Sequence, residues 1–210
     1  MARRLHEIRG GLRLRSHKQV TRNIPSRSLP LSEKLYLPLQ QHVGIAAFPC
    51  VEVGQSVQQG ELIAESSGYV GMRMHAPAAA TISAINDYPV VHPSGHRATC
   101  IELTTTDSTS RLDPCTGSPE VKDWTAIDRQ VVYERIERAG IVGLGGAGFP
   151  AHVKVHEGTA QSVETLIING VECEPYITCD DRLMQENPRE LIAGTELIAR
   201  TIQATNCIIA

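Results

Sequence analysis

Four glycines within six residues constrain this chain more than any other feature. They lie in the stretch Gly143-Leu144-Gly145-Gly146-Ala147-Gly148-Phe149-Pro150. Because glycine has no side chain, a ligand can approach the peptide groups of this stretch closely. A loop of this kind that opens into a helix presents N–H groups and the positive end of the helix dipole to an anion. Pro150 stands where a first helical residue would, and Lys154 follows it.

The glycine stretch fits neither the dinucleotide-binding motif nor the Walker phosphate-binding loop. The Walker loop requires Gly-Lys-Ser/Thr where Phe149-Pro150 stands. Gly143, Gly145 and Gly148 match G-x-G-x-x-G, but the dinucleotide-binding version follows a strand. Residues 128–139 instead have the apolar period of a helix that ends at Gly140. The stretch therefore predicts a phosphate or flavin cradle of another kind, with a glycine-rich turn between two helices as the alternative.

Composition and charge exclude several classes of protein. The 210 residues carry a formal net charge of −3, so no global positive field favours nucleic acid. No apolar run reaches the ~18 residues of a membrane span, and the first residues have no apolar segment of a secretory signal. Six cysteines without a C-x-x-C pair favour reduced thiols over a disulfide framework.

Residues 1–35 are expected to form an irregular arm that lies on the body of the protein. The segment has no sustained period and contains two prolines. It is basic, with Arg13, Arg15, Lys18, Arg22 and Arg27. Such an arm either favours an anionic partner or is only a solvated surface.

Residues 36–103 form the first predicted domain, an all-β module. Short runs at 51–53, 61–64 and 80–85 are separated by glycine, proline and asparagine. The segments 53–62 and 75–85 resemble two segments of biotinyl and lipoyl carrier domains, which implies a barrel-sandwich hybrid fold. No lysine lies between Lys34 and Lys122, so we expect a structural or interaction module without a covalent prosthetic group.

Two further features lie beyond the core of this module. His92 and His96 are four residues apart, but the proline and glycine between them favour a turn over a metal site. Residues 104–123 are expected to be a surface linker, because residues up to 120 are rich in Thr, Ser, Asp, Pro and Gly.

Residues 124–210 are predicted to form an α/β domain. Helices are expected at 128–139, 151–156, 180–184 and 188–204, with a buried strand at 165–168 and a second strand at 207–209. A strand, a crossover helix and a strand imply a parallel pair. A parallel sheet requires neighbours and cover on both faces, so we expect this to be the front part of a longer polypeptide.

A second stretch has side chains that could bind a ligand: Asn169-Gly170-Val171-Glu172-Cys173-Glu174-Pro175-Tyr176. It follows a predicted strand, where open α/β sheets bind ligands. Glu172 and Glu174 would accept hydrogen bonds from sugar hydroxyls, although exposed loop glutamates are also common. Together the two stretches suit a flavin mononucleotide (FMN), whose phosphate requires donors and whose ribityl chain requires acceptors. Cys173 has no evident base and is not a good candidate nucleophile.

The residues of both stretches carry a resemblance to a known family. G-I-V-G-L-G-G-A-G-F-P-A-H-V-K at 140–154 and T-L-I-I-N-G-V-E-C-E-P-Y-I-T-C-D-D-R-L-M at 165–184 are very similar to the C subunit of the Rnf/Rsx ion-translocating electron-transport complex. L-P-L-Q-Q-H at 37–42 and H-P-S-G at 92–95 resemble the same family. A more distant similarity extends to the FMN- and NADH-binding subunit of respiratory complex I.

The resemblance implies a peripheral subunit on the cytoplasmic side of the membrane. Such a subunit binds FMN, accepts hydride from NADH and passes electrons through 4Fe-4S clusters toward the other subunits and ferredoxin or flavodoxin. The clusters are expected only downstream of residue 210. The implied fold is a partial α/β flavin-binding domain with a parallel sheet, preceded by the barrel-sandwich hybrid module.

The resemblance also implies roles for individual residues. Gly143, Gly145, Gly146 and Gly148 would form the backbone cradle of FMN, with Lys154 beside the flavin and Asn169 and Glu172 as further contacts. Phe149, Lys154 and Glu174 would contact NADH, with Glu174 acting at the nicotinamide.

The chain departs from the wider flavoprotein pattern at several positions. Leu144 replaces an arginine, Ala151-His152 replaces threonine–glycine, and Val171 replaces an aspartate. Residues 10–15 match only the first part of an early G-G-I-H-P-P motif. A non-catalytic scaffold that keeps the fold without flavin is therefore the alternative function.

Overall fold

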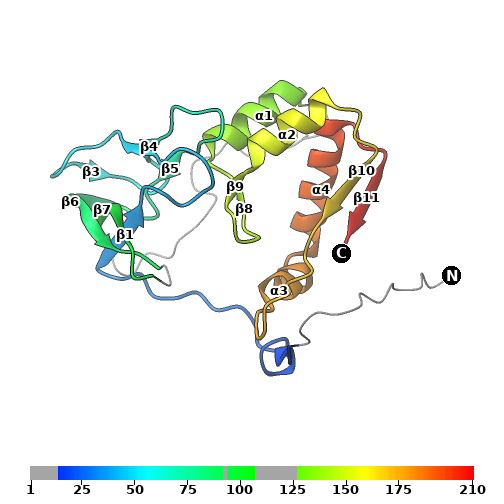
Figure 1. The fold of residues 1–210 in the computed structure, drawn as a ribbon, viewed down its shortest axis with the longest axis horizontal. Coiled ribbons are helices and arrows are strands. Elements are labelled where there is room, and N and C mark those ends of the chain that lie inside the picture. Colours follow the sequence, from blue (N-terminus) through cyan, green and yellow to red (C-terminus); the bar gives the residue numbers. More distant parts are fainter. Residues whose placement is uncertain (1–13, 92–93, 107–126) are drawn as a thin grey trace.

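The computed structural model describes residues 14–91, 94–106 and 127–210. Its elements fall into a β-rich amino-terminal module and an α/β part (Figure 1). His92 of the predicted histidine turn and most of the predicted linker lie outside these residues.

Two antiparallel sheets build the amino-terminal module. The larger has the strand order β1-β7-β6-β3 and the smaller β2-β4-β5. The strands are β1 (Lys34–Pro38), β2 (Phe48–Pro49), β3 (Ser56–Val57), β4 (Leu62–Glu65), β5 (Met74–His75), β6 (Ala80–Pro89) and β7 (Arg97–Thr105). Alternating residues of β6, among them Ala80 and Ile82, point into a core that includes Ile63, Ile101 and Leu103.

The second part contains helices around a short parallel sheet. Its elements are α1 (Arg129–Arg138), β8 (Val142–Gly143), β9 (Phe149–Pro150), α2 (Ala151–Ala160), β10 (Thr165–Ile168), α3 (Cys179–Glu186), α4 (Pro188–Ile202) and β11 (Asn206–Ile209). Strands β10 and β11 pair in parallel, as predicted. A core of Val132, Ile136, Val155 and Ile202 joins α1, α2 and α4.

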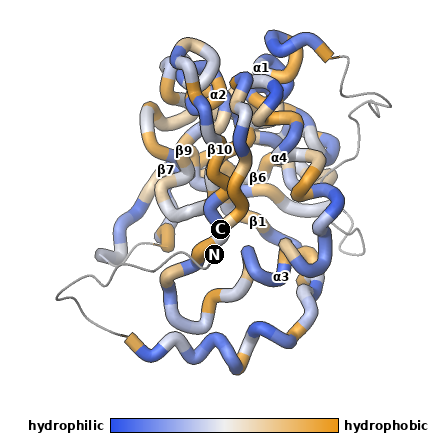
Figure 2. The backbone as a smooth tube through the Cα atoms, turned by 90° about the vertical axis from the view of Figure 1, so that its right-hand side faces the viewer, coloured by the Kyte–Doolittle hydropathy of each residue, from blue (hydrophilic) through white to orange (hydrophobic). Residues whose placement is uncertain are grey.

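Several expected elements have different bounds or burial. Residues 51–53 form no strand, and the strand predicted at 80–85 continues to Pro89. The strand at 165–168 is not buried: Ile167 is 60% exposed, although β10 is hydrophobic (Figure 2). Ile192 of α4 is half-exposed.

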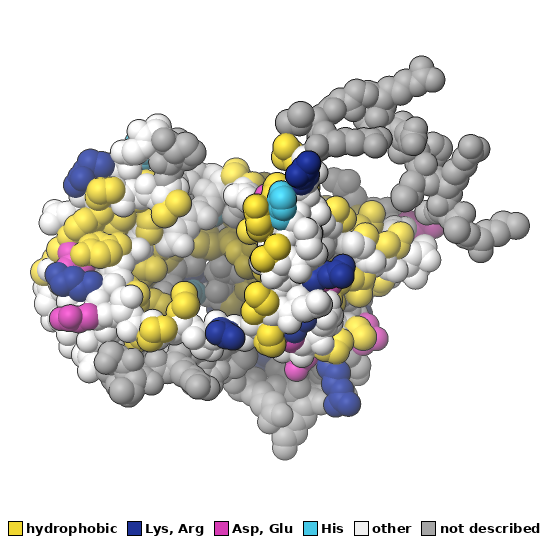
Figure 3. Space-filling view, turned by 90° about the horizontal axis from the view of Figure 1, so that it is seen from below, with side chains coloured by type: hydrophobic (Ala, Val, Ile, Leu, Met, Phe, Trp, Pro, Cys, Tyr) yellow, Lys and Arg dark blue, Asp and Glu magenta, His cyan; other side chains and the backbone are white. Residues whose placement is uncertain are grey.

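The glycine hairpin β8–β9 lies between the two parts of the molecule. Figure 1 shows it descending from the ends of α1 and α2, with the β module on one side and α4 on the other. Residues 14–33 pass below it, from the short 3-10 helix η1 (Lys18–Val20) beside α3 to β1. Seen from below, the surface is hollowed between two lobes (Figure 3).

Candidate functional site

The glycine stretch is the tip of a β-hairpin. Gly143 pairs with Phe149 and Val142 with Pro150, in antiparallel register. The expectation that the glycine loop opens directly into a helix is therefore wrong, because β9 separates the tip from α2, and Pro150 is the N-cap residue of that helix. Two-residue strands have too few positions to show a period in the sequence.

The outer side of the hairpin tip is open. A Cβ atom built on Gly145 or Gly146 would have no atom within 4 Å. Gly146 has φ of +102°, in the region that favours glycine. Peptide groups at this tip are therefore accessible to a ligand.

The other side of the tip rests on the β module. Val43 N–H donates to Ala147 O at 3.1 Å. Gly148 has φ of +59°, and a Cβ there would lie 2.7 Å from Gln41 O and 3.1 Å from the Cα of His42. Only glycine permits this approach of two backbones, so the segment 41–43 supports the hairpin from behind.

Lys154 extends from α2 back along the hairpin to the Gly143–Phe149 pair that borders the tip. Its Nζ lies 5.6 Å from the centre of the Phe149 ring. It would lie 3.0 Å from a Cβ built on Gly143. The side chain is exposed and forms no ion pair within the described residues. An unpaired cation beside accessible peptide groups is suited to an anion.

His42 adds an acceptor beneath the hairpin. The residue is 5% exposed, and its Nε2 lies 3.0 Å from Ile45 O. Burial lowers the pKa of His42, against an opposing effect of the Ile45 carbonyl. Because the Ile45 carbonyl oxygen can only accept, Nε2 is the donor to it, and Nδ1 of the neutral ring is an acceptor. Nδ1 of His42 is the buried side-chain atom that has no hydrogen-bond partner in the described part of the chain.

The acidic stretch forms a loop after the carboxyl end of β10. Asn169 Oδ1 accepts a hydrogen bond from Val171 N at 3.2 Å, and Gly170 N donates to Ala210 O at 2.6 Å. Gly170 lies against Met184 and Asp180 of α3, so a side chain there would crowd the helix. Asn169 and Gly170 thus set the direction in which the loop leaves the sheet.

The Glu172 carboxylate is engaged by the first turn of α3. Its oxygens accept hydrogen bonds from Asp180 N at 2.8 Å, Asp181 N at 3.2 Å and Cys179 Sγ at 3.0 Å. Burial raises the pKa of Glu172, but these donors and the nearby Lys18 outweigh it, and the net pKa is lowered. The carboxylate therefore acts as an N-terminal cap from outside the helix. Its contact with FMN stays a prediction.

Glu174 is exposed and makes no hydrogen bond or ion pair with the described residues. Its carboxylate is thus available to a ligand. The backbone on both sides of it, at Glu172 and Tyr176, is held by residues 16–21 of the arm. Contacts between segments about 155 residues apart leave no pattern in the sequence, so sequence analysis does not predict them.

Figure 1 shows the acidic loop below the glycine hairpin, beside α3. No hydrogen bond or ion pair joins the two segments within the ranges that the structure describes. A ligand that used both would have to bridge them.

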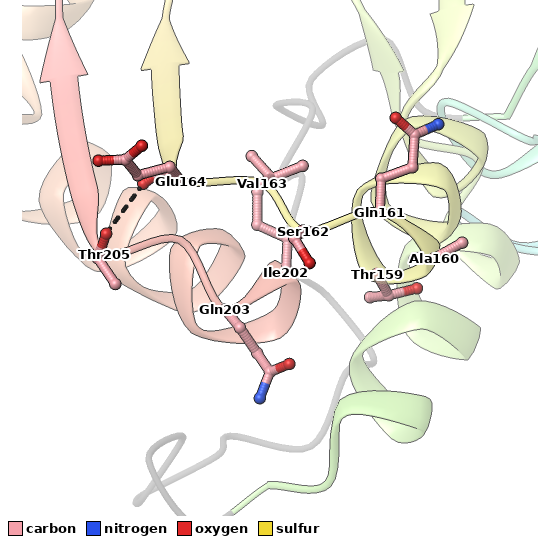
Figure 4. Close-up of a pocket in the computed structure, with 9 residues that line it drawn as sticks. All are labelled: Thr159, Ala160, Gln161, Ser162, Val163, Glu164, Ile202, Gln203 and Thr205. Atoms are coloured by element: carbon pink, nitrogen blue, oxygen red, sulfur yellow. Dashed lines mark hydrogen bonds between the residues drawn. The ribbon is translucent and has the colours of Figure 1, made fainter.

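A depression lies elsewhere, at the amino end of β10. It has a volume of about 490 Å³ and is lined by the ends of α2 and α4 and the segments that lead into β10 and β11 (Figure 4). Thr205 Oγ1 donates there to Glu164 O at 3.2 Å. The lining includes Gln161, Ser162 and Gln203 but no basic residue. This depression does not suit a phosphate group.

Two family models match the chain. Residues 6–106 match the RnfC barrel sandwich hybrid domain, and residues 136–210 match the Nuo51 FMN-binding domain. These matches agree with the two parts of the fold. The predicted boundaries at 35, 103 and 123 stay predictions.

Curated relatives match nearly the whole chain. The C subunit of an ion-translocating oxidoreductase complex from Pseudomonas aeruginosa is 39% identical over 200 residues, which are 94% of this chain and 25% of the relative. The Serratia proteamaculans protein of the same name is 40% identical, over 95% and 28%. The C subunit of a proton-translocating ferredoxin:NAD(+) oxidoreductase complex from Clostridium ljungdahlii is 33% identical, over 98% and 44%.

The chain spans about a quarter to less than a half of the length of these relatives. Among the described residues, no helix is long and apolar enough to cross a membrane. The order of the two matching domains and the identity over nearly all of the chain give one assignment. The chain belongs to the family of C subunits of the Rnf-type ion-translocating oxidoreductase complexes.

Proposed function

We propose that this chain binds FMN at the glycine hairpin and uses it to accept hydride from NADH. It would do so as the peripheral C subunit, on the cytoplasmic side of the membrane, of an ion-translocating NADH:ferredoxin oxidoreductase. Electrons would continue through 4Fe-4S clusters downstream of residue 210 to the other subunits, and from them to ferredoxin or flavodoxin. The observation that carries the proposal is the unpaired Lys154 ammonium beside an open glycine tip.

The described residues fit FMN in two respects. Gly145 and Gly146 leave peptide groups of the hairpin tip accessible to a phosphate or to a flat ring, with Gly143 beside Lys154 and Gly148 packed on the segment 41–43 that supports the tip. Lys154 supplies a cation.

Bound FMN would supply a two-electron acceptor that also releases electrons singly. The chain's own residues would bind and orient the reactants. Lys154 would neutralise anionic charge, and Phe149 would offer a ring face to the nucleotide, over which the Lys154 ammonium already lies. Asn169 would hold the acidic loop in place, and Glu174 would orient the nicotinamide from that loop.

One observation favours the alternative of a scaffold without flavin. Both carboxylate oxygens of Glu172 are already hydrogen-bonded to α3, so this predicted FMN contact is satisfied within the protein. Flavin absorbance of the purified full-length polypeptide decides between the two functions.

Substitution of Lys154 tests the proposal directly. A charge-assisted hydrogen bond contributes about 1.5–3 kcal/mol, so Lys154→Met is expected to weaken FMN binding about 10- to 100-fold. Lys154→Arg should retain most of the affinity because it keeps the charge. The measurement is a titration of the apoprotein followed by flavin fluorescence.

Arg189→Met is the matched control, since Arg189 is exposed on α4 and its side chain makes no hydrogen bond or ion pair with the described residues. It removes the same charge at the start of α4, a helix that carries no residue of the proposed FMN site. Equal FMN affinity in Lys154→Met and the control would remove Lys154 from the site.

A further inference from the structure

Residues 16–26 lie against the acidic loop and α3, although these segments are far apart in the sequence. We refer to this segment as the strap. Four of its contacts reach the loop, and two reach α3. Figure 1 shows η1, the short helix of the strap, beside the turn that precedes α3.

The strap holds the loop on both sides of Glu174. On one side, Lys18 Nζ donates to the main-chain oxygen of Glu172. On the other, Tyr176 N donates to Ser16 O at 2.8 Å, and Thr21 Oγ1 donates to Tyr176 O at 2.8 Å. The backbone that presents Glu174 is therefore fixed from outside the loop.

An aromatic stack completes the contact with the loop. The rings of His17 and Tyr176 lie 4.9 Å apart at an interplanar angle of 9°. Tyr176 is half-exposed, so this contact and the hydrogen bonds to Ser16 and Thr21 are what hold it.

The loop has a conformation that needs such support. Glu172 has φ of +45° and Tyr176 has φ of +67°, and neither is a glycine. Residues with side chains are strained in this region and persist there only when the surroundings impose it. The strap forms hydrogen bonds with the main chain of both strained residues. It is therefore part of the surroundings that impose their conformation.

Two contacts anchor the far end of the strap on α3. Arg182 Nη1 donates to Arg22 O at 3.3 Å, and Ser26 N donates to Glu186 Oε1 at 3.0 Å. The ion pair between Arg182 and Glu186, at 2.5 Å, orients both α3 side chains toward the strap. The strap is thus fixed at its two ends by different elements.

We propose that the strap is a positioning element of the NADH site: through Lys18 and Thr21 it holds the loop in the conformation that presents Glu174. This rests on the proposed function for the role of Glu174. The fixing of the loop itself rests only on the contacts above.

The test is the double variant Lys18→Met and Thr21→Val in the full-length polypeptide. It removes both side-chain donors to the loop and keeps the size of each side chain. The control is Arg27→Met and Ser28→Val, which makes the same change of charge and hydroxyl at exposed residues whose side chains form no hydrogen bond or ion pair with the described chain. Hydrogen exchange is measured without added nucleotide, so this readout does not depend on FMN.

We expect amide exchange at Tyr176 and its neighbours to be about tenfold faster in the strap variant and unchanged in the control. Unchanged exchange in the loop would overturn the proposal. Exchange that rises equally throughout α1, α2 and α4 would also overturn it, because it would show a general loss of stability.

The second readout is the reaction with NADH at equal FMN occupancy. The strap variant is expected to lose about tenfold in kcat/KM for NADH and to retain its FMN affinity, while Thr21→Ser, which keeps the hydroxyl, behaves as the wild type. A normal NADH reaction despite faster loop exchange would overturn the positioning role. Absence of flavin from the wild type would contradict the proposed function, whereas the exchange result would still decide whether the strap fixes the loop.

Discussion

Two glycines of the hairpin have opposite surroundings, although they are three residues apart. A side chain on Gly145 would meet open space, whereas one on Gly148 would meet the backbone of Gln41. The first position is therefore a candidate for contact with a ligand, and the second for contact within the protein. The sequence alone does not distinguish the open glycine from the packed one.

The two glycines can be separated experimentally. Gly148→Ala is expected to lower the free energy of unfolding of the ligand-free protein by about 1–3 kcal/mol, because its φ is positive and its Cβ is crowded. Gly145→Ala should change it by less than about 0.5 kcal/mol but weaken FMN binding at least about tenfold, because the new methyl group would occupy the ligand's side of the tip. Urea unfolding and a flavin titration measure the two effects. Unimpaired FMN binding by Gly145→Ala would place the cofactor elsewhere.

Glu174 allows cofactor binding to be separated from the reaction with NADH. Glu174→Gln keeps the shape of the side chain and removes its charge, and no contact within the described chain depends on that charge. We expect bound FMN to be retained and its reduction by NADH to slow about tenfold, which corresponds to about 1.4 kcal/mol. Stopped-flow bleaching of the flavin measures this, with dithionite reduction as the control. Equal rates would exclude a role for Glu174, and loss of flavin would assign it to the FMN site.

Among the elements, α3 depends on a residue outside it. The helix has no side-chain cap from its own N-cap residue, Thr178. Glu172, seven residues before Cys179, supplies the acceptors instead. The start of α3 and the direction of the acidic loop are therefore stabilised by the same carboxylate.

This capping predicts a pH-dependent stability. Glu172→Ala is expected to destabilise the ligand-free protein by about 1 kcal/mol, while Glu174→Ala, two residues away, should have no measurable effect. The pKa of Glu172 is lowered from its ordinary 4.5. Its contribution is therefore complete above pH 4.5 and is lost as the pH falls through the lower folded value. Unfolding free energies of the two variants at pH 7 and below pH 4 measure this, and a constant difference between the variants would contradict the capping role.

Secondary-structure elements were predicted correctly from the sequence where the pattern that marks them is local. Asp128 and Gly140 flank α1, whose bounds are those expected within a residue, because caps act over a single turn. The paired strands β10 and β11 also follow from local apolar runs. The hairpin β8–β9 is too short to show a period, and residues 51–53 are apolar and polar in alternation without a partner strand.

The candidate site was predictable only in part for the same reason. Glycines and carboxylates identify the two segments, since those residue types are needed for the chemistry. The occupation of Glu172 by α3, the support of the tip by residues 41–43 and the contacts of the strap are all made through space. None of them changes the pattern of the residues involved.

At the scale of the whole molecule, the described residues of the β module contact the α/β part at several places. Residues 41–43 support the hairpin. Tyr69 Oη donates to Glu157 Oε1 at 2.7 Å and lies 3.1 Å from His156 Nδ1, on the helix that carries Lys154. Gly140, at the end of α1, lies against the carbonyl of Arg73. The module thus serves as a support for the hairpin and for α2, a role that needs no prosthetic group.

Gly140 tests whether this support maintains the site. Gly140 and Gly54 both have positive φ, of +65° and +91°, so alanine is strained at either position by about 1–3 kcal/mol. At Gly140 the new Cβ would also lie 2.2 Å from Arg73 O in the β module, whereas at Gly54 it would meet nothing.

We expect Gly140→Ala to destabilise the protein by more than Gly54→Ala and to separate the module from the end of α1. Because the same module supports the hairpin through the bond from Val43 to Ala147, hydrogen exchange at the Val43 amide should rise, and FMN binding should weaken, only in Gly140→Ala. Urea unfolding, amide exchange and a flavin titration of the two variants measure these effects. If the two variants lost the same stability and kept the same exchange at Val43, the contact between the parts would have no role in holding the hairpin, and the cradle would depend on α1, α2 and its own turn alone.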